Sequence, residues 1–309
     1  MIDPRLHTLR LLREHGTVTA AAAALHLTPS TVSQQLRLLA KELDVQLLEQ
    51  IGRRVRLTSA AHTLLRHADE LFAQAERARA ELAAHRTGIT GVLRISAMPT
   101  ALVALVAPAA ARLRDANPLL TIEMSEDESR HCFDLLLTGD SDIGVLIPTS
   151  GGPAPDDARF EQRQLIDEPQ DLLVPAGHRL AECRSVALAE AAEEPWVGAP
   201  ERVAHCQLQL GACAAAGFMP RITQRGVDWI GISAMVAHGF GVSLIPRLAT
   251  LPTDHAVVRV PLHGDSAPTR RHIICIRRGS AAQPAIAAGL TAIREVCQER
   301  DDVTLVDIG

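Results

Sequence analysis

The chain has 309 residues, which is too long for one ordinary domain and predicts two or three. Its 47% hydrophobic content allows buried cores and argues against disorder. A net charge of −5 gives no sign of a nucleic-acid partner, but residues 1–58 alone carry eight basic and five acidic side chains, a net of +3. Residues 59–309 therefore carry a net charge of −8. A small basic head on an acidic body is expected where one end meets phosphate.

The six cysteines show neither a Cys-x-x-Cys pair nor a zinc-site spacing, so we expect no metal, no cofactor and a reducing compartment. Cys206 and Cys213 are close enough in sequence for a redox pair, with ordinary small hydrophobes as the alternative. The first sixteen residues are charged throughout, and no apolar run reaches about 18 residues. We therefore expect a soluble, cytoplasmic protein without a signal peptide.

The chain begins with two predicted helices. Asp3–Glu14 has leucines on one side and ends at Gly16. Either Thr17 or Thr19 can cap the alanine-rich helix that follows, whose small side chains allow a second helix to cross closely.

A third helix begins at Thr28, with Pro29 at the first helical position, where its missing N–H costs nothing. Val32, Leu36 and Leu39 recur at i, i+4 and i+7 and are predicted to face inward. Short hydrogen-bonding side chains and one arginine then face outward, as base edges and phosphates in a major groove require. A merely solvated face is the alternative. The predicted DNA-binding residues of this segment are Thr28, Pro29, Ser30, Thr31, Ser33, Gln34 and Arg37.

A basic hairpin follows. Gly52 turns the chain, and residues 53–57 alternate basic and apolar side chains. We expect a wing whose Arg53 and Arg54 contact phosphates or the minor groove. A plain solvated charge run is the alternative.

Ser59–Arg86 contains neither proline nor glycine and is predicted to be one long helix, followed by a hinge at residues 87–91. Apolar residues recur along it at 4-3-4-3-4 spacing, which is typical of a coiled-coil seam. We expect a dimerisation helix, with packing on the chain's own body as the alternative. The predicted seam comprises Leu64, Ala68, Leu71, Ala75, Ala78 and Leu82.

After Gly91 predicted strands and helices alternate, from strand Val92–Met98 and helix Pro99–Asn117 to strand Arg271–Arg277 and helix Ala281–Gln298. This alternation predicts α/β lobes with mainly parallel sheets, and there is too much of it for one compact sheet. We expect two lobes with a cleft. Residues 159–175 are interpreted as two extended runs.

A ligand of such lobes binds at the carboxyl ends of strands and at the helix N-termini that follow. Thr100 fits this place, with a simple helix cap as the alternative. Across the cleft, Arg202 can pair with an anion and Trp229 can stack on a ring. The full set of candidate effector-binding residues is Ala97, Met98, Thr100, Thr149, Arg202, Asp228 and Trp229.

The segment Val18–Leu39 and the run Arg53-Arg54-Val55-Arg56-Leu57-Thr58 resemble the LysR-type transcriptional regulators. The glycine-rich segment Ala237–Pro246 is similar to one typical of that family's body, and the order of parts agrees over nearly the whole chain. The sequence departs from the usual motif of the family at Pro29-Ser30-Thr31, where Gln-Pro-Ala is common.

The resemblance implies a multi-domain chain with an α-helical winged helix-turn-helix head, a long linker helix and an α/β, two-lobed effector domain like a periplasmic binding protein. It also implies a homodimer or dimer of dimers on an inverted-repeat operator in double-stranded DNA, modulated by a small-molecule effector. The expected boundaries are 1–58 (head), 59–90 (linker and hinge), 91–300 (effector domain) and 301–309 (tail), with lobe I at about 91–162 plus 266–300 and lobe II at about 163–265.

Three other classes compete with this interpretation. An enzyme is disfavoured because the sequence has no nucleophile elbow, phosphate loop or His-Glu-x-x-His motif. A solute-binding module of the periplasmic-receptor type fits the body but not the basic head. A ligand-independent architectural DNA-binding protein fits the head but gives the cleft no role.

Overall fold

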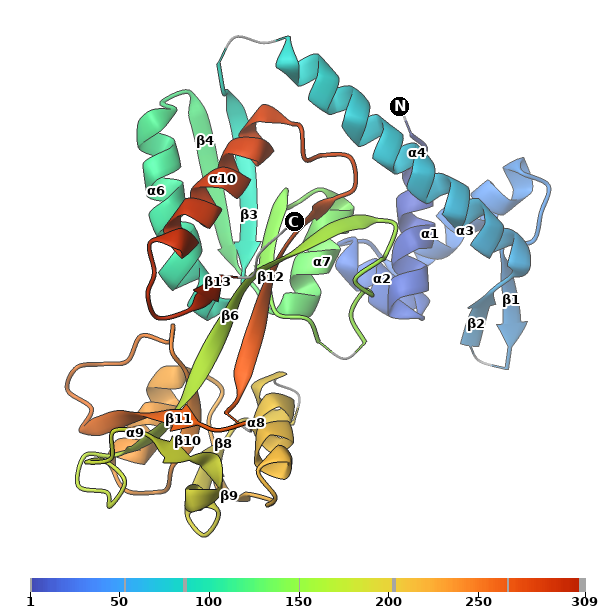
Figure 1. The fold of residues 1–309 in the computed structure, drawn as a ribbon. Helices are drawn as coiled ribbons and strands as arrows, with labels where there is room; N and C mark the ends of the chain where they lie inside the picture. The colour runs from blue at the N-terminus through green and yellow to red at the C-terminus, as the bar shows by residue number, and fades with distance from the viewer. Residues whose placement is uncertain are drawn as a thin grey trace.

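The computed structural model describes residues 2–52, 54–85, 88–149, 151–201, 204–265 and 267–305. The winged head and the long helix α4 (Ser59–Ala84) lie against one of two α/β lobes, and the second lobe lies beyond a pair of crossing strands (Figure 1). No helix in the described ranges is long and apolar enough to span a membrane.

The head is a three-helix unit with a two-stranded wing. Gly16, at φ 67°, ends the first helix, and Thr17 caps the second through the N–H of Ala20 at 3.2 Å. The inward positions Val32, Leu36 and Leu39 are buried as predicted. The elements of the head and linker are α1 (Pro4–His15), α2 (Val18–Ala24), α3 (Pro29–Glu42), β1 (Leu48–Ile51), β2 (Arg54–Leu57) and α4 (Ser59–Ala84).

In lobe I, α6 (Ala107–Ala116) and α10 (Pro284–Gln298) lie side by side on one face of the sheet, and α7 (Ser129–Thr138) lies on the other (Figure 1). The core of the lobe joins α6 and α10 to the strands that they cover. The predicted helix after Pro99 is interrupted by a π-helical segment, in which Ala107 N–H reaches the carbonyl of Leu102. Pro108 follows, and its ring nitrogen carries no N–H for a regular helical bond. The elements of lobe I are β3 (Gly91–Ala97), α5 (Pro99–Ala101), η1 (Leu102–Val106), α6 (Ala107–Ala116), β4 (Leu120–Glu126), α7 (Ser129–Thr138), β5 (Ile143–Leu146), α10 (Pro284–Gln298) and β13 (Thr304–Leu305).

Lobe II packs around the fully buried Trp196, whose indole N–H donates to the carbonyl of Ala191 at 3.1 Å. This bond satisfies the one polar atom of a large buried side chain. The elements of lobe II are β7 (Val186–Ala187), η2 (Leu188–Ala191), β8 (Pro195–Gly198), α8 (Ala204–Ala215), β9 (Arg221–Arg225), α9 (Trp229–Ala237), β10 (Ser243–Pro246) and β11 (Val257–His263).

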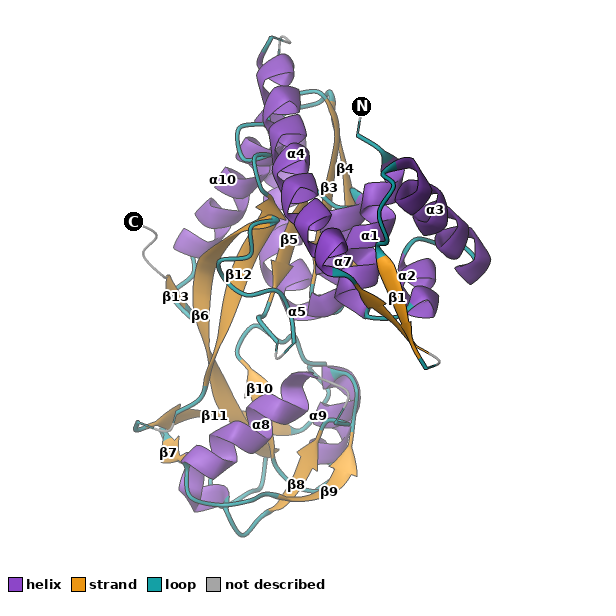
Figure 2. Cartoon of the chain, turned by 90° about the vertical axis from the view of Figure 1, so that its right-hand side faces the viewer, coloured by secondary structure: helices purple, strands orange, loops and turns teal. Residues whose placement is uncertain are grey.

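Two long strands, β6 (Phe160–Pro175) and β12 (Thr269–Arg277), connect the lobes (Figure 2). β6 pairs with β12 as far as Pro169, and from Gln170 onward it pairs with β10 and β11. The interpretation of residues 159–175 as two runs is therefore wrong, because one strand changes partners instead of breaking. The expectation of mainly parallel sheets is also wrong: β3, β4 and β5 are parallel, but every strand that pairs with β6 runs antiparallel to it.

The head shares a hydrophobic core with lobe I. Leu9 and Leu11 of α1 belong to the same buried cluster as Leu136 of α7 and Phe160 of β6. Ion pairs reinforce the contact, with Arg159 Nη1 lying 2.8 Å from Glu14 Oε2. α4 contributes a buried face to this side of the molecule, so packing on the chain's own body, the alternative interpretation of this helix, is present.

Candidate nucleic-acid interface and effector cleft

The N-terminus of α3 is fixed by its own threonine. Thr28 Oγ1 accepts a hydrogen bond from the N–H of Thr31 at 3.2 Å, and Pro29 occupies the first turn. This cap satisfies an N–H that otherwise lacks a partner at a helix start. The start of the helix is thus set by Thr28 and Pro29, as the sequence predicted.

The outward face of α3 is polar and open to solvent. Ser30, Gln34 and Arg37 are exposed, while Thr31 and Ser33 are half-buried. Ser33 Oγ donates to the carbonyl of Pro29 at 2.8 Å, so in this structure its hydroxyl hydrogen is used inside the helix. Ser30 Oγ lies 2.8 Å from Thr28 Oγ1, and Arg37 Nε donates to the carbonyl of Ser33 at 3.3 Å. Gln34 and the terminal nitrogens of Arg37 are therefore the groups of this face that remain most available to a partner.

One glutamine of α3 points the other way. Gln35 accepts a hydrogen bond from Thr8 Oγ1 of α1 at 2.6 Å. This contact links α3 to α1 beside the apolar core. Of the two neighbouring glutamines, Gln34 is therefore exposed and Gln35 lies against α1. The inward position of Gln35 follows from the helical period, since Val32 and Leu36 beside it are buried.

The basic hairpin is a two-stranded antiparallel ribbon with Ile51 opposite Arg54 and Gly52 at φ 60° in the turn. Arg56 is exposed and pairs with Glu49 across the ribbon at 2.7 Å. Arg53 lies outside the described residues, and so does the side chain of Arg54. The wing fold is present, and the contacts of its first two arginines remain a prediction.

The residues of the predicted seam on α4 differ in their exposure to solvent. Ala68 is fully buried within the chain, whereas Leu71 and Leu82 are 55% and 66% exposed. The face that packs on the body instead includes Ala61, Leu65 and their neighbours along the helix. Two different faces of α4 are therefore apolar, one covered and one open.

A small cavity of about 70 Å³ lies between the lobes, where the N-terminal ends of α5, α7 and α9 meet. Met98, Thr100 and Trp229 line this effector cleft, and they are three of the predicted effector residues. The other members of that set lie differently. Ala97 is buried in the core of lobe I, and Asp228 caps α9 through the N–H of Gly231 at 2.6 Å.

Thr149 is half-buried and does not line the cleft, and Arg202 lies outside the described residues. Four polar residues of the cleft were not predicted from the sequence, namely Glu128, Ser129, His205 and Arg270. Ser129 follows the same rule that suggested Thr100, because it begins the helix after a strand. Arg270 and His205 carried no comparable signal.

Arg270 forms the polar floor of the cleft. Its side chain is 3% exposed, with Nε 2.5 Å from Glu168 Oε2 and Nη2 donating to Thr100 Oγ1 at 2.6 Å. His272 Nε2 lies 2.7 Å from the same Glu168 oxygen. Burial alone raises the pKa of Glu168, but the bond from His272 and the charge of Arg270 lower it to about 2. The carboxylate therefore stays charged and holds Arg270 in place.

His205 is 6% exposed and lies against Trp229, with ring centroids 4.6 Å apart. Among the described residues neither ring nitrogen has a hydrogen-bond partner. Burial and then the charge of Arg270 lower the pKa of His205 to about 3, so the ring is neutral. A neutral imidazole offers one donor and one acceptor to a bound molecule.

The two cysteines that were considered as a redox pair both lie buried on α8. Seven residues of helix separate Cys206 from Cys213 by about 10 Å along the axis, whereas a disulfide needs Cα atoms roughly 4.4–6.8 Å apart. Burial raises the pKa of Cys213 to about 12. A disulfide is thus incompatible with the folded helix, and Cys213 is a core residue beside Trp196.

A winged head with an exposed polar helix, a long linker helix and a two-lobed domain with a polar cleft define the class of ligand-responsive DNA-binding regulators. Family models agree with this class over most of the chain. Residues 4–62 match the bacterial regulatory helix-turn-helix protein of the lysR family, and residues 86–298 match the LysR substrate binding domain. The chain belongs to the LysR family of transcriptional regulators, and it combines a DNA-binding domain with an effector-binding domain.

Curated relatives cover most of the chain at modest identity. The regulator ShiR of Corynebacterium glutamicum is 29% identical over 86% of this chain and 90% of its own length. A probable hydrogen peroxide-inducible genes activator of Mycobacterium avium is 28% identical over 95% of this chain and 93% of its own. A full-length OxyR variant from Pseudomonas aeruginosa has a similar structure, with a TM-score of 0.65 and 22% identity over 100% of this chain and 99% of that chain.

Proposed function

We propose that this regulator binds an inverted-repeat operator as a homodimer or a dimer of dimers, with α3 in the major groove and the wing on the backbone. The exposed polar face of α3 on a capped, rigid start is the observation that carries the proposal. Ser30, Gln34 and Arg37 supply the base contacts and therefore the sequence preference. Arg53 and Arg54 supply phosphate contacts and therefore salt-dependent affinity.

A second copy of the chain provides the twofold symmetry that an inverted repeat requires. The open stripe at Leu71 and Leu82 on α4 supports dimerisation through this helix, because large exposed apolar side chains at heptad spacing favour burial against a partner.

The effector is a small molecule that binds in the cleft between the lobes. Thr100, His205 and Arg270 surround that cleft, and their polar atoms can orient a ligand. Bound between the lobes, the effector shifts the equilibrium between two lobe arrangements by its difference in affinity for them. The crossing strands β6 and β12 are the elements that absorb such a change.

The test is fluorescence anisotropy of the full-length protein on the DNA upstream of its own gene and on a scrambled duplex of equal length. We expect at least roughly a thousand-fold preference for the upstream DNA at physiological salt. Equal affinity for the two duplexes contradicts operator recognition. A chain that keeps its cellular function without residues 1–90 favours the solute-binding alternative.

The architectural alternative differs in its response to ligand. In that case a metabolite panel leaves both the melting temperature and the DNA affinity unchanged, and DNA binding stays steeply salt-dependent. We expect instead that at least one metabolite raises the melting temperature and changes operator binding.

A further inference from the structure

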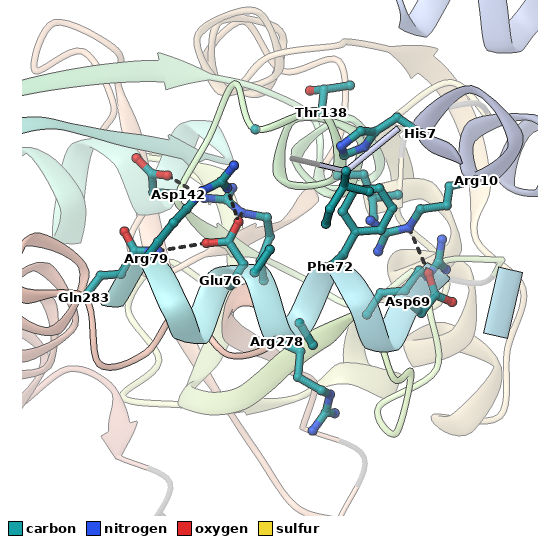
Figure 3. A pocket seen from close by; sticks show the side chains of 17 residues that line it. His7, Arg10, Asp69, Phe72, Glu76, Arg79, Thr138, Asp142, Arg278 and Gln283 are labelled. Atoms are coloured by element: carbon teal, nitrogen blue, oxygen red, sulfur yellow. Dashed lines mark hydrogen bonds and ion pairs between the residues drawn. The ribbon is translucent and has the colours of Figure 1, made fainter. Parts of the chain in front are cut away.

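A second and larger cavity lies outside the effector cleft. It has a volume of about 480 Å³ and is enclosed by α1 of the head, α4 of the linker and lobe I. In Figure 3, Asp69, Phe72 and Glu76 project from α4 toward it, and His7 and Arg10 reach into it from the head. Its walls thus come from three parts of the chain that are distant in sequence.

Arginine dominates the charged lining of this cavity. The lining residues that the structure describes include five arginines and three carboxylates. Two of the arginines are fully engaged with neighbouring acids. Arg159 binds Glu14 and Asp157 at 2.8 and 2.7 Å, and Arg277 binds Asp142 at 2.7 Å.

Arg10 differs from these engaged arginines. It is 4% exposed, and its Nε lies 2.9 Å from Asp69 Oδ1 without the geometry of a hydrogen bond. Asp69 is shared, because its other oxygen accepts from Arg13 at 3.1 Å. The Arg10 guanidinium also lies over the ring of Phe72, whose centroid is 4.3 Å away. A buried cation is stable only when charge and hydrogen bonds compensate it, and here the compensation is partial.

The pKa of His7 is affected by the same excess of positive charge. Its ring packs against Phe72 in a tilted arrangement, with centroids 4.2 Å apart, and lines the cavity. Burial and then the charges of Arg10, Arg277 and Arg79 lower the pKa of His7 to about 4. A neutral His7 can still donate a hydrogen bond to an anion beside Arg10.

We propose that the cavity between α1, α4 and lobe I is a second ligand site, distinct from the effector cleft, which takes a small anion whose phosphate or carboxylate group pairs with Arg10. A guanidinium binds such groups with two parallel, charge-assisted hydrogen bonds. Arg79 also lines the cavity, where it pairs with Glu76 at 2.9 Å, and its side chain is 61% exposed, so it meets the anion at the open side.

Occupancy of this site bears on the position of the head. Because the head and the linker form two of its walls, an anion bound there stabilises the arrangement in which the head is docked on lobe I. By linkage, any DNA complex that requires a different arrangement binds the anion less well, and the anion weakens that complex equally.

The probe is inorganic phosphate, tested by thermal unfolding of the full-length protein against sodium chloride at matched ionic strength. We expect a saturable rise in melting temperature with phosphate and roughly tenfold weaker phosphate binding in Arg10→Gln. Arg112→Gln, which removes an exposed arginine of lobe I, is the matched control and keeps wild-type phosphate binding. A phosphate response no larger than that of chloride overturns the proposal.

Two more variants make the result decisive. Arg79→Gln is surface-exposed and should fold even where Arg10→Gln does not, and we expect it to weaken phosphate binding about threefold. Unchanged binding in both Arg79→Gln and any folded Arg10→Gln overturns the site. Thr100→Val in the effector cleft should leave phosphate binding unchanged, and a loss there overturns the proposal by placing the anion between the lobes.

Discussion

At the scale of single residues, helical periodicity was a good guide to burial in the head. Val32, Leu36 and Leu39 face the core, and Thr28 caps α3 as its sequence position indicates. The role of Arg270 was not predictable, because it depends on the pairing of β12 with β6 and on a contact with Thr100, which lies 170 residues earlier in the chain. The role of such a side chain depends on pairing between segments that are distant in sequence. Helical periodicity carries no information about that pairing.

Replacing Arg37 with alanine tests whether the exposed polar face of α3 contacts bases. We expect a loss of roughly 1–3 kcal/mol in binding to the specific operator and little change on scrambled DNA, since a base contact discriminates sequence. Anisotropy titrations on the two duplexes measure both affinities. Arg112→Ala, in lobe I, is the control. Equal losses on both duplexes would show that Arg37 contacts phosphate.

Replacing Arg54 with alanine tests the wing. A phosphate contact carries no sequence information, so all sequences should lose affinity alike. The slope of log K against log salt should fall in magnitude by about 1. A salt titration of DNA binding measures this slope, and an unchanged slope removes Arg54 from the phosphate contacts.

Two histidines that folding keeps neutral, the buried His205 and the half-buried His7, predict a stability that depends on pH. The pKa of His205 is lowered to about 3 and that of His7 to about 4, so the unfolded chain binds more protons than the folded one below their ordinary pKa of about 6.5. Stability is therefore fully present above pH 6.5 and falls as pH decreases toward 4. Thermal unfolding between pH 4.5 and 8 should show this fall, and His205→Gln should make it shallower. An unchanged pH profile in the variant contradicts the assignment.

At the scale of elements, the bounds of the first helix and of the linker helix were predicted within two residues. α4 was predicted as Ser59–Arg86 and is observed as Ser59–Ala84. The strand β6 was not predicted as one strand, because Pro169 interrupts its pattern of polar and apolar residues. The backbone nevertheless continues through Pro169. Pro169 lies where β6 exchanges β12 for β10 and β11, and a residue without an N–H is tolerated where regular pairing ends. Only the three-dimensional pairing shows this exchange.

The open stripe of α4 gives a prediction at this scale. The double variant Leu71→Ser, Leu82→Ser removes large apolar side chains from both copies of a symmetric interface, so we expect at least a tenfold rise in the dimer dissociation constant. Sedimentation velocity over a concentration series measures it. Leu119→Ser, which alters an exposed leucine of lobe I, should leave the assembly unchanged. A double variant that assembles like the wild type places the dimer interface elsewhere.

At the scale of the whole molecule, the order of head, linker and two-lobed body could be predicted from sequence, but the docking of the head on lobe I could not. That docking rests on contacts such as Glu14 with Arg159 and on a core shared by Leu9 and Phe160. Each partner has an ordinary local role in its own element, so the sequence gives no sign that they meet.

The most direct test of the central claim is nuclease footprinting of the full-length protein on the DNA upstream of its own gene, with and without candidate metabolites. We expect a protected inverted repeat at modest salt, and a change in the extent of protection when the effector of the cleft is present. Absence of any protected site at that salt would contradict the account of α3 and the wing as an operator-reading head.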